Sequence, residues 1–179
     1  MSISADWLID DVQQNRNQIE TNDSPLNRRN YLHSLFSYYE FSLSTLRERT
    51  AQLIISSYEF NGHLDIHELY ALMDNTVRLS DNGHIKLDNN RLPFLSLAAF
   101  TLKTYAKLIN FEKAVLSDHR WESLCKSIKI RNRITHPKLD TDIEISNDEL
   151  KIIYDGWSWW IEIVKQLRDA DLTAILNIK

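Results

Sequence analysis

Glycine and proline are scarce in this chain, with three of each among 179 residues. β-Sandwiches and β-barrels need many tight turns, which these residues commonly supply, whereas long helices need few. The sequence therefore favours an all-α fold. A chain of this length can bury a sizeable core, so we expect residues 1–179 to form a single helical domain.

The spacing of apolar residues predicts where the helices lie. The clearest pattern predicts a long helix over about residues 26–58, because apolar side chains follow alternating steps of four and three, with Thr50 in the remaining place. Further helices are expected over about 5–20, 64–74, 93–111, 118–136 and from a capping box at 146–149 to about 169. Alternating residues around Asp81-Asn82-Gly83 predict a small β-hairpin near 77–87. We expect an antiparallel helical bundle of five to six helices with this hairpin inserted.

Cysteine usage and the N-terminus bear on the compartment. The single cysteine, Cys125, leaves no internal disulfide and fits a reducing cytosol. The N-terminal residues are polar and acidic, unlike a secretory signal, and no apolar run is long enough to cross a bilayer. The sequence therefore predicts a cytoplasmic protein with no membrane partner. Cys125 itself falls on a predicted core face and is expected to pack there.

The charge is unevenly distributed along the chain. The formal net charge is −4, but residues 119–138 form a basic segment in which only Glu122 is acidic. The cations of this segment are Arg120, Lys126, Lys129, Arg131, Arg133 and Lys138. Such a segment is typical either of a local anion site or of a solvated helix face balanced by the acidic loop over 140–149.

Arg131 and His136 are the residues of this segment best suited to phosphate chemistry. Histidine moves protons near neutral pH, and arginine is a fixed cation for a phosphate that gains charge. Residues five apart are separated by about 140° on a helix, so the pair can converge only if the helix ends near Thr135. Pro137 favours such an end. Alternatively, Arg131 and Arg133 are cations that complement the helix dipole, and His136 is a helix cap.

The pattern Arg131-Asn132-x-x-x-His136, late in a predicted helical bundle, resembles the R-x4–6-H motif of the HEPN superfamily. Asn132 matches the polar residue that follows the arginine in that family. The resemblance implies a metal-independent RNA endonuclease without a cofactor, acting as a homodimer and possessing a composite site. In that site two His136 side chains serve as base and acid, paired Arg131 side chains hold the charge, and Asn132 orients His136 or a phosphate oxygen. It also implies a toxin or defence effector, with an antitoxin or regulatory protein as a partner.

Three further residues are candidates for supporting roles. HEPN proteins often carry an acidic residue in an early helix near the motif, which makes Glu40 a candidate, although it could instead be an exposed helix charge or pair with Arg47. Arg133 and Lys138 could steer RNA or be ordinary surface charges. Some toxins of the family carry a modifiable tyrosine where this chain has Lys138, so that form of control is not expected.

Two other hypotheses remain open. His63 and His67 stand four apart, as a metal pair on one helix face requires, with Asp65 and His84 nearby in sequence. The pattern names no third ligand, so loop polarity is the simpler interpretation. The second hypothesis is a non-catalytic HEPN-fold module for dimerisation or for protein or nucleotide binding.

The tryptophans of the last predicted helix bear on that second hypothesis. Trp157 and Trp160 lie on its apolar stripe and are expected to pack in a core or dimer contact. Trp159 points elsewhere and, if exposed, could belong to an interface.

Overall fold

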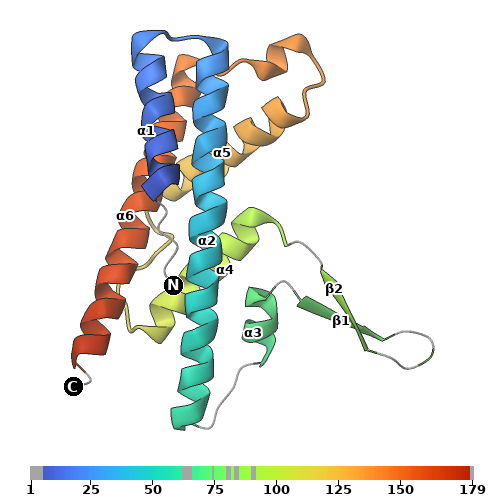
Figure 1. The fold of residues 1–179 in the computed structure, drawn as a ribbon, viewed down its shortest axis with the longest axis vertical. Coiled ribbons are helices and arrows are strands. Elements are labelled where there is room, and N and C mark those ends of the chain that lie inside the picture. The colour runs from blue at the N-terminus through green and yellow to red at the C-terminus, as the bar shows by residue number, and fades with distance from the viewer. Residues whose placement is uncertain are drawn as a thin grey trace. The chain divides into compact units, whose positions relative to one another are not determined.

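The computed structural model describes residues 6–61, 66–73, 75–79, 82, 85–89 and 92–177. These residues form six α-helices, one short 3₁₀ helix and two short strands (Figure 1). In chain order they are α1 (Asp6–Thr21), α2 (Pro25–Asn61), α3 (Ile66–Leu72), β1 (Asn75–Leu79), β2 (Ile85–Asn89), α4 (Phe94–Leu108), α5 (His119–Thr135), η1 (Asp140–Ile143) and α6 (Asn147–Asn177). The predicted all-α class is confirmed.

The chain divides into two compact units. The first comprises Met1–Ser42 and Leu116–Asp169, and the second comprises Leu43–Val115 and Ala170–Lys179. Helices α2 and α6 contribute to both units because their residue ranges cross these boundaries. No linker was evident in the sequence at any of the three boundaries between these ranges, and the single domain expected over 1–179 stays a prediction.

In the first unit, α5 and α6 run antiparallel. Arg120 near the start of α5 pairs with Glu162, whereas Arg133 near its end pairs with Glu149, so partner numbers fall along α6 as they rise along α5. The helices lie close together at Gly156, where an added Cβ would be 2.9 Å from the backbone nitrogen of Leu124. Glycine is required at this contact because any side chain would meet the backbone of α5.

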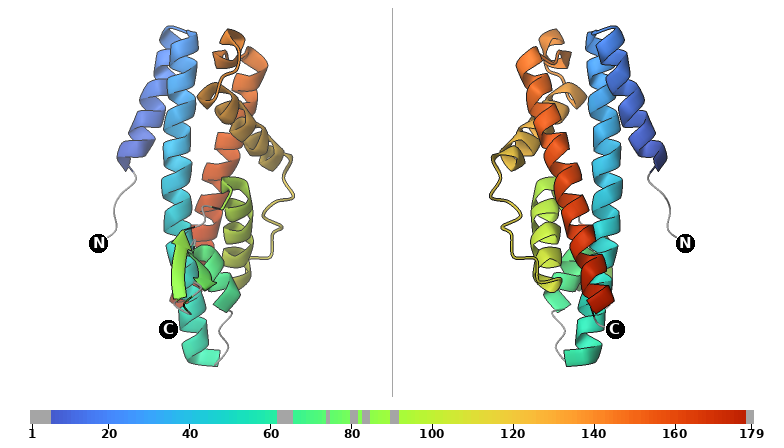
Figure 2. Two further views of the ribbon diagram at one scale, coloured as in Figure 1. Left: turned by 90° about the vertical axis from the view of Figure 1, so that its right-hand side faces the viewer. Right: turned by 90° about the vertical axis from the view of Figure 1, so that its left-hand side faces the viewer.

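Helix α2 runs parallel to α6 within the same unit. The ring of Tyr31 lies 5.3 Å from that of Tyr154, and further along α2 Ser42 accepts a hydrogen bond from Trp160. The residue numbers of the contacting pairs therefore increase together along α2 and α6, as they do when two helices are parallel. Figure 2 shows α1 and the first part of α2 side by side, joined by a short turn that makes them antiparallel. α2 and α6 are not consecutive helices, and the long stretch of chain between them allows them to run in the same direction.

Two of the tryptophans of α6, Trp159 and Trp160, lie in the core of the first unit. Trp160 is fully buried, and its indole N–H donates to the hydroxyl of Ser42 over 2.9 Å. Trp159 is also buried, with its ring 5.3 Å from that of Trp121 in α5. The interface role considered for Trp159 is therefore not supported, because α5 covers the side of α6 that lies off the main apolar stripe.

The helix ends follow the predicted capping chemistry. The Asp118 side chain accepts the backbone N–H of Arg120 over 2.8 Å at the start of α5. Ser146 and Glu149 exchange backbone-to-side-chain bonds of 3.0 and 3.2 Å before α6, as in a capping box. Helix α5 ends at Thr135, two residues before Pro137. Helix α6 continues to Asn177, beyond its predicted end near 169.

The second unit contains α3, α4 and the strands. β1 and β2 pair antiparallel with Val77 opposite Leu87, and Asp81 and Gly83 of the connecting turn lie outside the described residues. In the same unit, the buried Asp171 accepts hydrogen bonds from Arg49 and Tyr105. Of the helices in the described part of the chain, none is both long and apolar enough to span a membrane.

Candidate functional site

The side chain of Arg131 extends from α5 to the first half of α2. Its guanidinium carbon is 5.5 Å from the centroid of the Phe36 ring, and one terminal nitrogen is 3.8 Å from Oε1 of Glu40. The ring contact holds the guanidinium on the surface of α2. The ion pair is long, and the Glu40 side chain is 62% exposed, so it adds little stability. Arg131 therefore has a fixed position but remains able to bind a stronger anion such as phosphate.

His136 stands at the end of the same helix with an exposed side chain. Its backbone N–H still donates to the carbonyl of Asn132 over 3.1 Å, so helical spacing continues to His136. The separation of about 140° from Arg131 is thus retained. Both residues are described, and no hydrogen bond or ion pair joins their side chains. The helix ends where the sequence predicted, but the end does not fold His136 back towards Arg131.

Asn132 contacts both residues in different ways. Its backbone carbonyl holds the N–H of His136, and its side-chain oxygen lies 3.4 Å from a terminal nitrogen of Arg131. The second contact is at the long limit for a hydrogen bond. The exposed amide of Asn132 is therefore a weak neighbour of Arg131, and it remains accessible to a ligand.

Glu40 and Arg47 have separate environments. Glu40 faces the motif arginine, as described above, and Arg47 donates from Nε to the carbonyl of Leu72 over 2.7 Å. Glu40 lies beside Arg131 with a side chain that is 62% exposed, so it is both a neighbour of the motif and an exposed helix charge. This position makes Glu40 a neighbour of the motif from a helix far away in sequence.

Arg133 contacts other groups of the protein through one end of its guanidinium. One terminal nitrogen donates to the carbonyl of Glu144 over 2.7 Å and to Oε2 of Glu149 over 3.1 Å. Lys138 is exposed, and its backbone N–H donates to the Asp142 carboxylate over 2.8 Å. Backbone hydrogen bonds from Lys138 and Leu139 lower the pKa of Asp142 below its ordinary value.

Lys126 and Lys129 were noted in the basic segment but were not assigned to the site. Both are exposed on α5. Lys129 precedes His136 by seven residues, which is about two helical turns, so the two share one face. Neither lysine has an ion-pair partner among the described residues. The spacing between Lys129 and His136 could have assigned this lysine to the site from the sequence. Lys126 and Lys129 form a line of positive charge that leads to the histidine.

The proposed metal ligands lie mostly outside the described residues. His67 lies in α3, but His63, Asp65 and His84 fall outside the described ranges. The described part of the chain holds no group of three or more His, Cys, Asp or Glu residues placed to bind a metal. Cys125 is partly buried, and burial raises the pKa of its thiol, which disfavours the nucleophilic thiolate.

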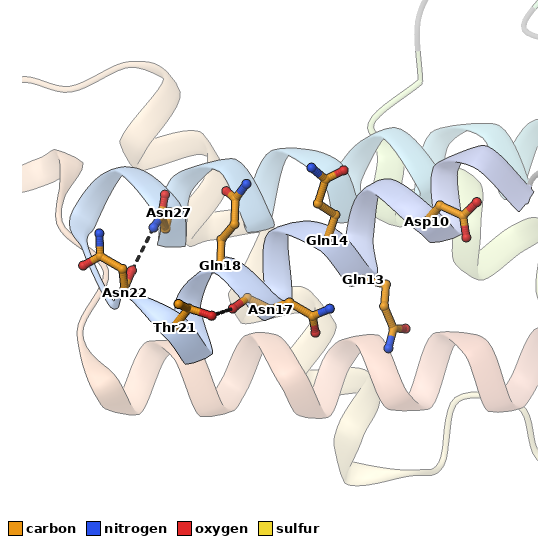
Figure 3. A pocket seen from close by; sticks show the side chains of 8 residues that line it. All are labelled: Asp10, Gln13, Gln14, Asn17, Gln18, Thr21, Asn22 and Asn27. Atoms are coloured by element: carbon orange, nitrogen blue, oxygen red, sulfur yellow. Dashed lines mark hydrogen bonds between the residues drawn. The ribbon is translucent and has the colours of Figure 1, made fainter.

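An open hollow of about 670 Å³ lies along α1 and the start of α2 (Figure 3). Its lining is mostly amide and hydroxyl side chains, and Asp10 is its one ionisable residue. The full lining is Asp10, Gln13, Gln14, Asn17, Gln18, Thr21, Asn22 and Asn27. The hollow offers no base and acid pair, and no residue of the Arg131–His136 motif lines it.

Comparisons of the chain with protein-family models, with curated proteins and with solved structures gave no match. The relation to the HEPN superfamily therefore rests on the motif and on its helical setting, and it stays a prediction.

Proposed function

We propose that this protein is a metal-independent RNA endonuclease whose site combines Arg131, Asn132 and His136 from two copies of the chain. The observation that carries the proposal is the setting of Arg131. Arg131 is held against Phe36 and Glu40 of α2. Its own helix, α5, ends next to the exposed His136. A fixed cation and an accessible imidazole are the two groups that phosphodiester cleavage by a 2′-hydroxyl needs.

The reaction requires two proton transfers on opposite sides of the phosphorus. A base removes the proton of the 2′-hydroxyl, whose oxygen then bonds to phosphorus as the bond to the 5′-oxygen breaks. An acid returns a proton to that 5′-oxygen. The products are a 2′,3′-cyclic phosphate and a 5′-hydroxyl end. One chain offers one His136 at the motif, so two chains are needed to supply both the base and the acid.

Arg131 stabilises the charge that develops on the phosphorus oxygens. Its weak contact with Glu40 is easily exchanged for a bidentate contact with phosphate. Lys126 and Lys129 attract the RNA backbone towards His136 along α5. The net charge of −4 gives the chain as a whole no attraction for RNA, which makes this local line of cations important.

The direct test is RNA cleavage in the presence of EDTA. We expect the wild-type protein to cut single-stranded RNA, and His136→Ala to lower the rate by at least about 100-fold, the lower range for loss of a general acid or base. His119→Ala is the matched control, because His119 is an exposed histidine at the opposite end of α5. Helical circular dichroism should be unchanged in both variants. Equal cleavage by wild type and His136→Ala would overturn the proposal.

The alternative function, a non-catalytic module for dimerisation or for binding a protein or nucleotide, predicts a protein that is inert on varied RNAs. It drew support from the tryptophan-rich last helix. Trp159 and Trp160 are both buried within the first unit, so they do not form an exposed docking surface.

A toxin or defence role with an antitoxin partner belongs to the nuclease proposal, and it predicts growth arrest on expression that His136→Ala relieves.

A further inference from the structure

Three consecutive backbone carbonyls after the motif each accept a hydrogen bond from a different arginine. Arg29 donates to Ile143 over 3.3 Å, Arg133 to Glu144 over 2.7 Å, and Arg28 to Ile145 over 2.6 Å. Arginine is suited to this task because its guanidinium carries five N–H donors and is always charged. We name residues 137–146, which link α5 to α6, the post-motif segment.

The remaining contacts of the post-motif segment fix its two ends. Near its start, the Asp142 carboxylate accepts the backbone N–H groups of Lys138 and Leu139 over 2.8 and 3.0 Å. At its end, Ser146 and Glu149 form the capping box of α6. The same Glu149 oxygen that accepts the N–H of Ser146 also pairs with Arg133. A connection without strands or long helices is thus held by charged groups along its length.

We infer that Arg133 is a positioning residue for His136, holding the backbone that follows it, rather than a residue that steers RNA; this inference rests on the proposed nuclease function. Among the described residues, no side chain bonds the His136 imidazole, so the backbone on either side determines where it lies. On the helix side, the Asn132 carbonyl holds the N–H of His136. On the other side, Arg133, which lies in the helix that His136 follows, bonds Glu144 and Glu149 and so holds the far end of the post-motif segment against α5.

Arg133 is the clearest of the three arginines to test. Arg28 also binds Asp23 and Asn147, so its removal would disturb the start of α2 and of α6. Arg29 makes a longer bond of 3.3 Å. Arg133 makes both of its contacts to residues that follow His136, so its loss acts on the post-motif segment most directly.

Arg120 provides a matched control within the same pair of helices. It also joins α5 to a glutamate of α6, it pairs in addition with Asp118 at the start of α5, and its side chain is 27% exposed against 35% for Arg133. It lies in the first turn of α5, far along the helix from His136. We expect Arg133→Gln to lower kcat at least about 10-fold with KM changed less than about 2-fold, because a displaced imidazole impairs proton transfer and leaves RNA binding intact. Arg120→Gln should retain kcat, and Arg133→Lys should recover part of it.

Three results would overturn the inference. A rise in KM with unchanged kcat and a weaker salt dependence in Arg133→Gln would show RNA steering. Equal losses of kcat in Arg120→Gln and Arg133→Gln would show a general loss of stability. The third readout does not depend on RNA: the amides of Lys138 and Leu139 should exchange faster with solvent in Arg133→Gln than in wild type, and unchanged protection would show that Arg133 does not hold the segment. If wild type leaves RNA intact while this protection is lost, the nuclease proposal fails and the structural role of Arg133 stands.

Discussion

At the scale of single residues, Arg131 and Arg133 are separated by one residue and have opposite environments. Arg131 rests on the Phe36 ring with a long, weak ion pair, whereas Arg133 is bonded to the carbonyl of Glu144 and to Glu149. The difference follows from helical geometry, because positions two apart point about 160° away from each other. One arginine is available to a ligand and the other is part of the protein framework.

Asp171 is a second residue whose surroundings determine its chemistry. Its carboxylate accepts bonds of 2.7 and 2.9 Å from Arg49 and one of 2.8 Å from the Tyr105 hydroxyl. Hydrogen bonding from Arg49 lowers the pKa of Asp171, outweighing burial, which raises it, and Tyr105 lowers it further. Asp171 is separated by more than sixty residues from either partner, so no local pattern in the sequence predicted these hydrogen bonds.

This arrangement predicts a pH-dependent loss of stability in Asp171→Asn. A carboxyl whose pKa is lowered by folding gives its full stabilisation above its ordinary pKa of 3.8 and loses it as the pH falls through the lower folded value. We expect Asp171→Asn to lower the free energy of unfolding by about 2 kcal/mol at neutral pH, the range for weakening a partly buried charged hydrogen bond. Urea unfolding should show a constant difference from wild type near neutral pH that shrinks below the ordinary pKa.

The exposed Asp155 of the same helix is the control, and Asp155→Asn should change little at any pH. A difference between wild type and Asp171→Asn that grows on acidification would contradict the assignment.

At the scale of elements, the crossing of α5 and α6 depends on Gly156. An alanine Cβ there would lie 2.9 and 3.0 Å from backbone atoms of Leu124, which cannot rotate away as a side chain can. Alanine has the higher helix propensity by about 1 kcal/mol, so on propensity alone the substitution should stabilise α6. We predict the reverse, a loss of about 1–3 kcal/mol in the free energy of unfolding, because the overpacked contact forces the helices apart.

Ser158→Ala, at an exposed position of α6, tests propensity without the contact and should be neutral or slightly stabilising in the same unfolding measurement. Greater stability of Gly156→Ala than of wild type would show that the helices do not meet closely at this point.

Much of the helical content could be predicted because it follows from local signals. The apolar spacing of α2 was sufficient to identify its core face, including the fully buried Thr50. Asp118 and the Ser146–Glu149 pair could be recognised as caps because a cap needs only a few neighbouring residues.

The features that could not be predicted depend on partners far away in sequence. The parallel direction of α2 and α6 follows from how the intervening chain packs, and no turn between them encodes it. Burial of Trp159 depends on Trp121 of α5. For the candidate site, the motif was visible in sequence, but the Phe36 contact and the engagement of Arg133 required the fold.

At the scale of the whole molecule, the proposed chemistry exceeds what one chain supplies. Helical spacing leaves Arg131 and His136 on different sides of α5, and each chain carries one motif histidine. A second copy would add the missing proton donor or acceptor, as closed twofold symmetry allows. The functional unit we propose is therefore a homodimer with one shared site.

The most direct measurement of this claim is to mix subunits. Wild-type protein is refolded with a tenfold excess of His136→Ala, and differently tagged subunits confirm that the two have mixed. If each site needs two copies of His136, cleavage of RNA in EDTA should fall to about a tenth of that given by the same amount of wild type alone, because random pairing leaves few wild-type dimers. Undiminished cleavage in fully mixed dimers would contradict a shared site.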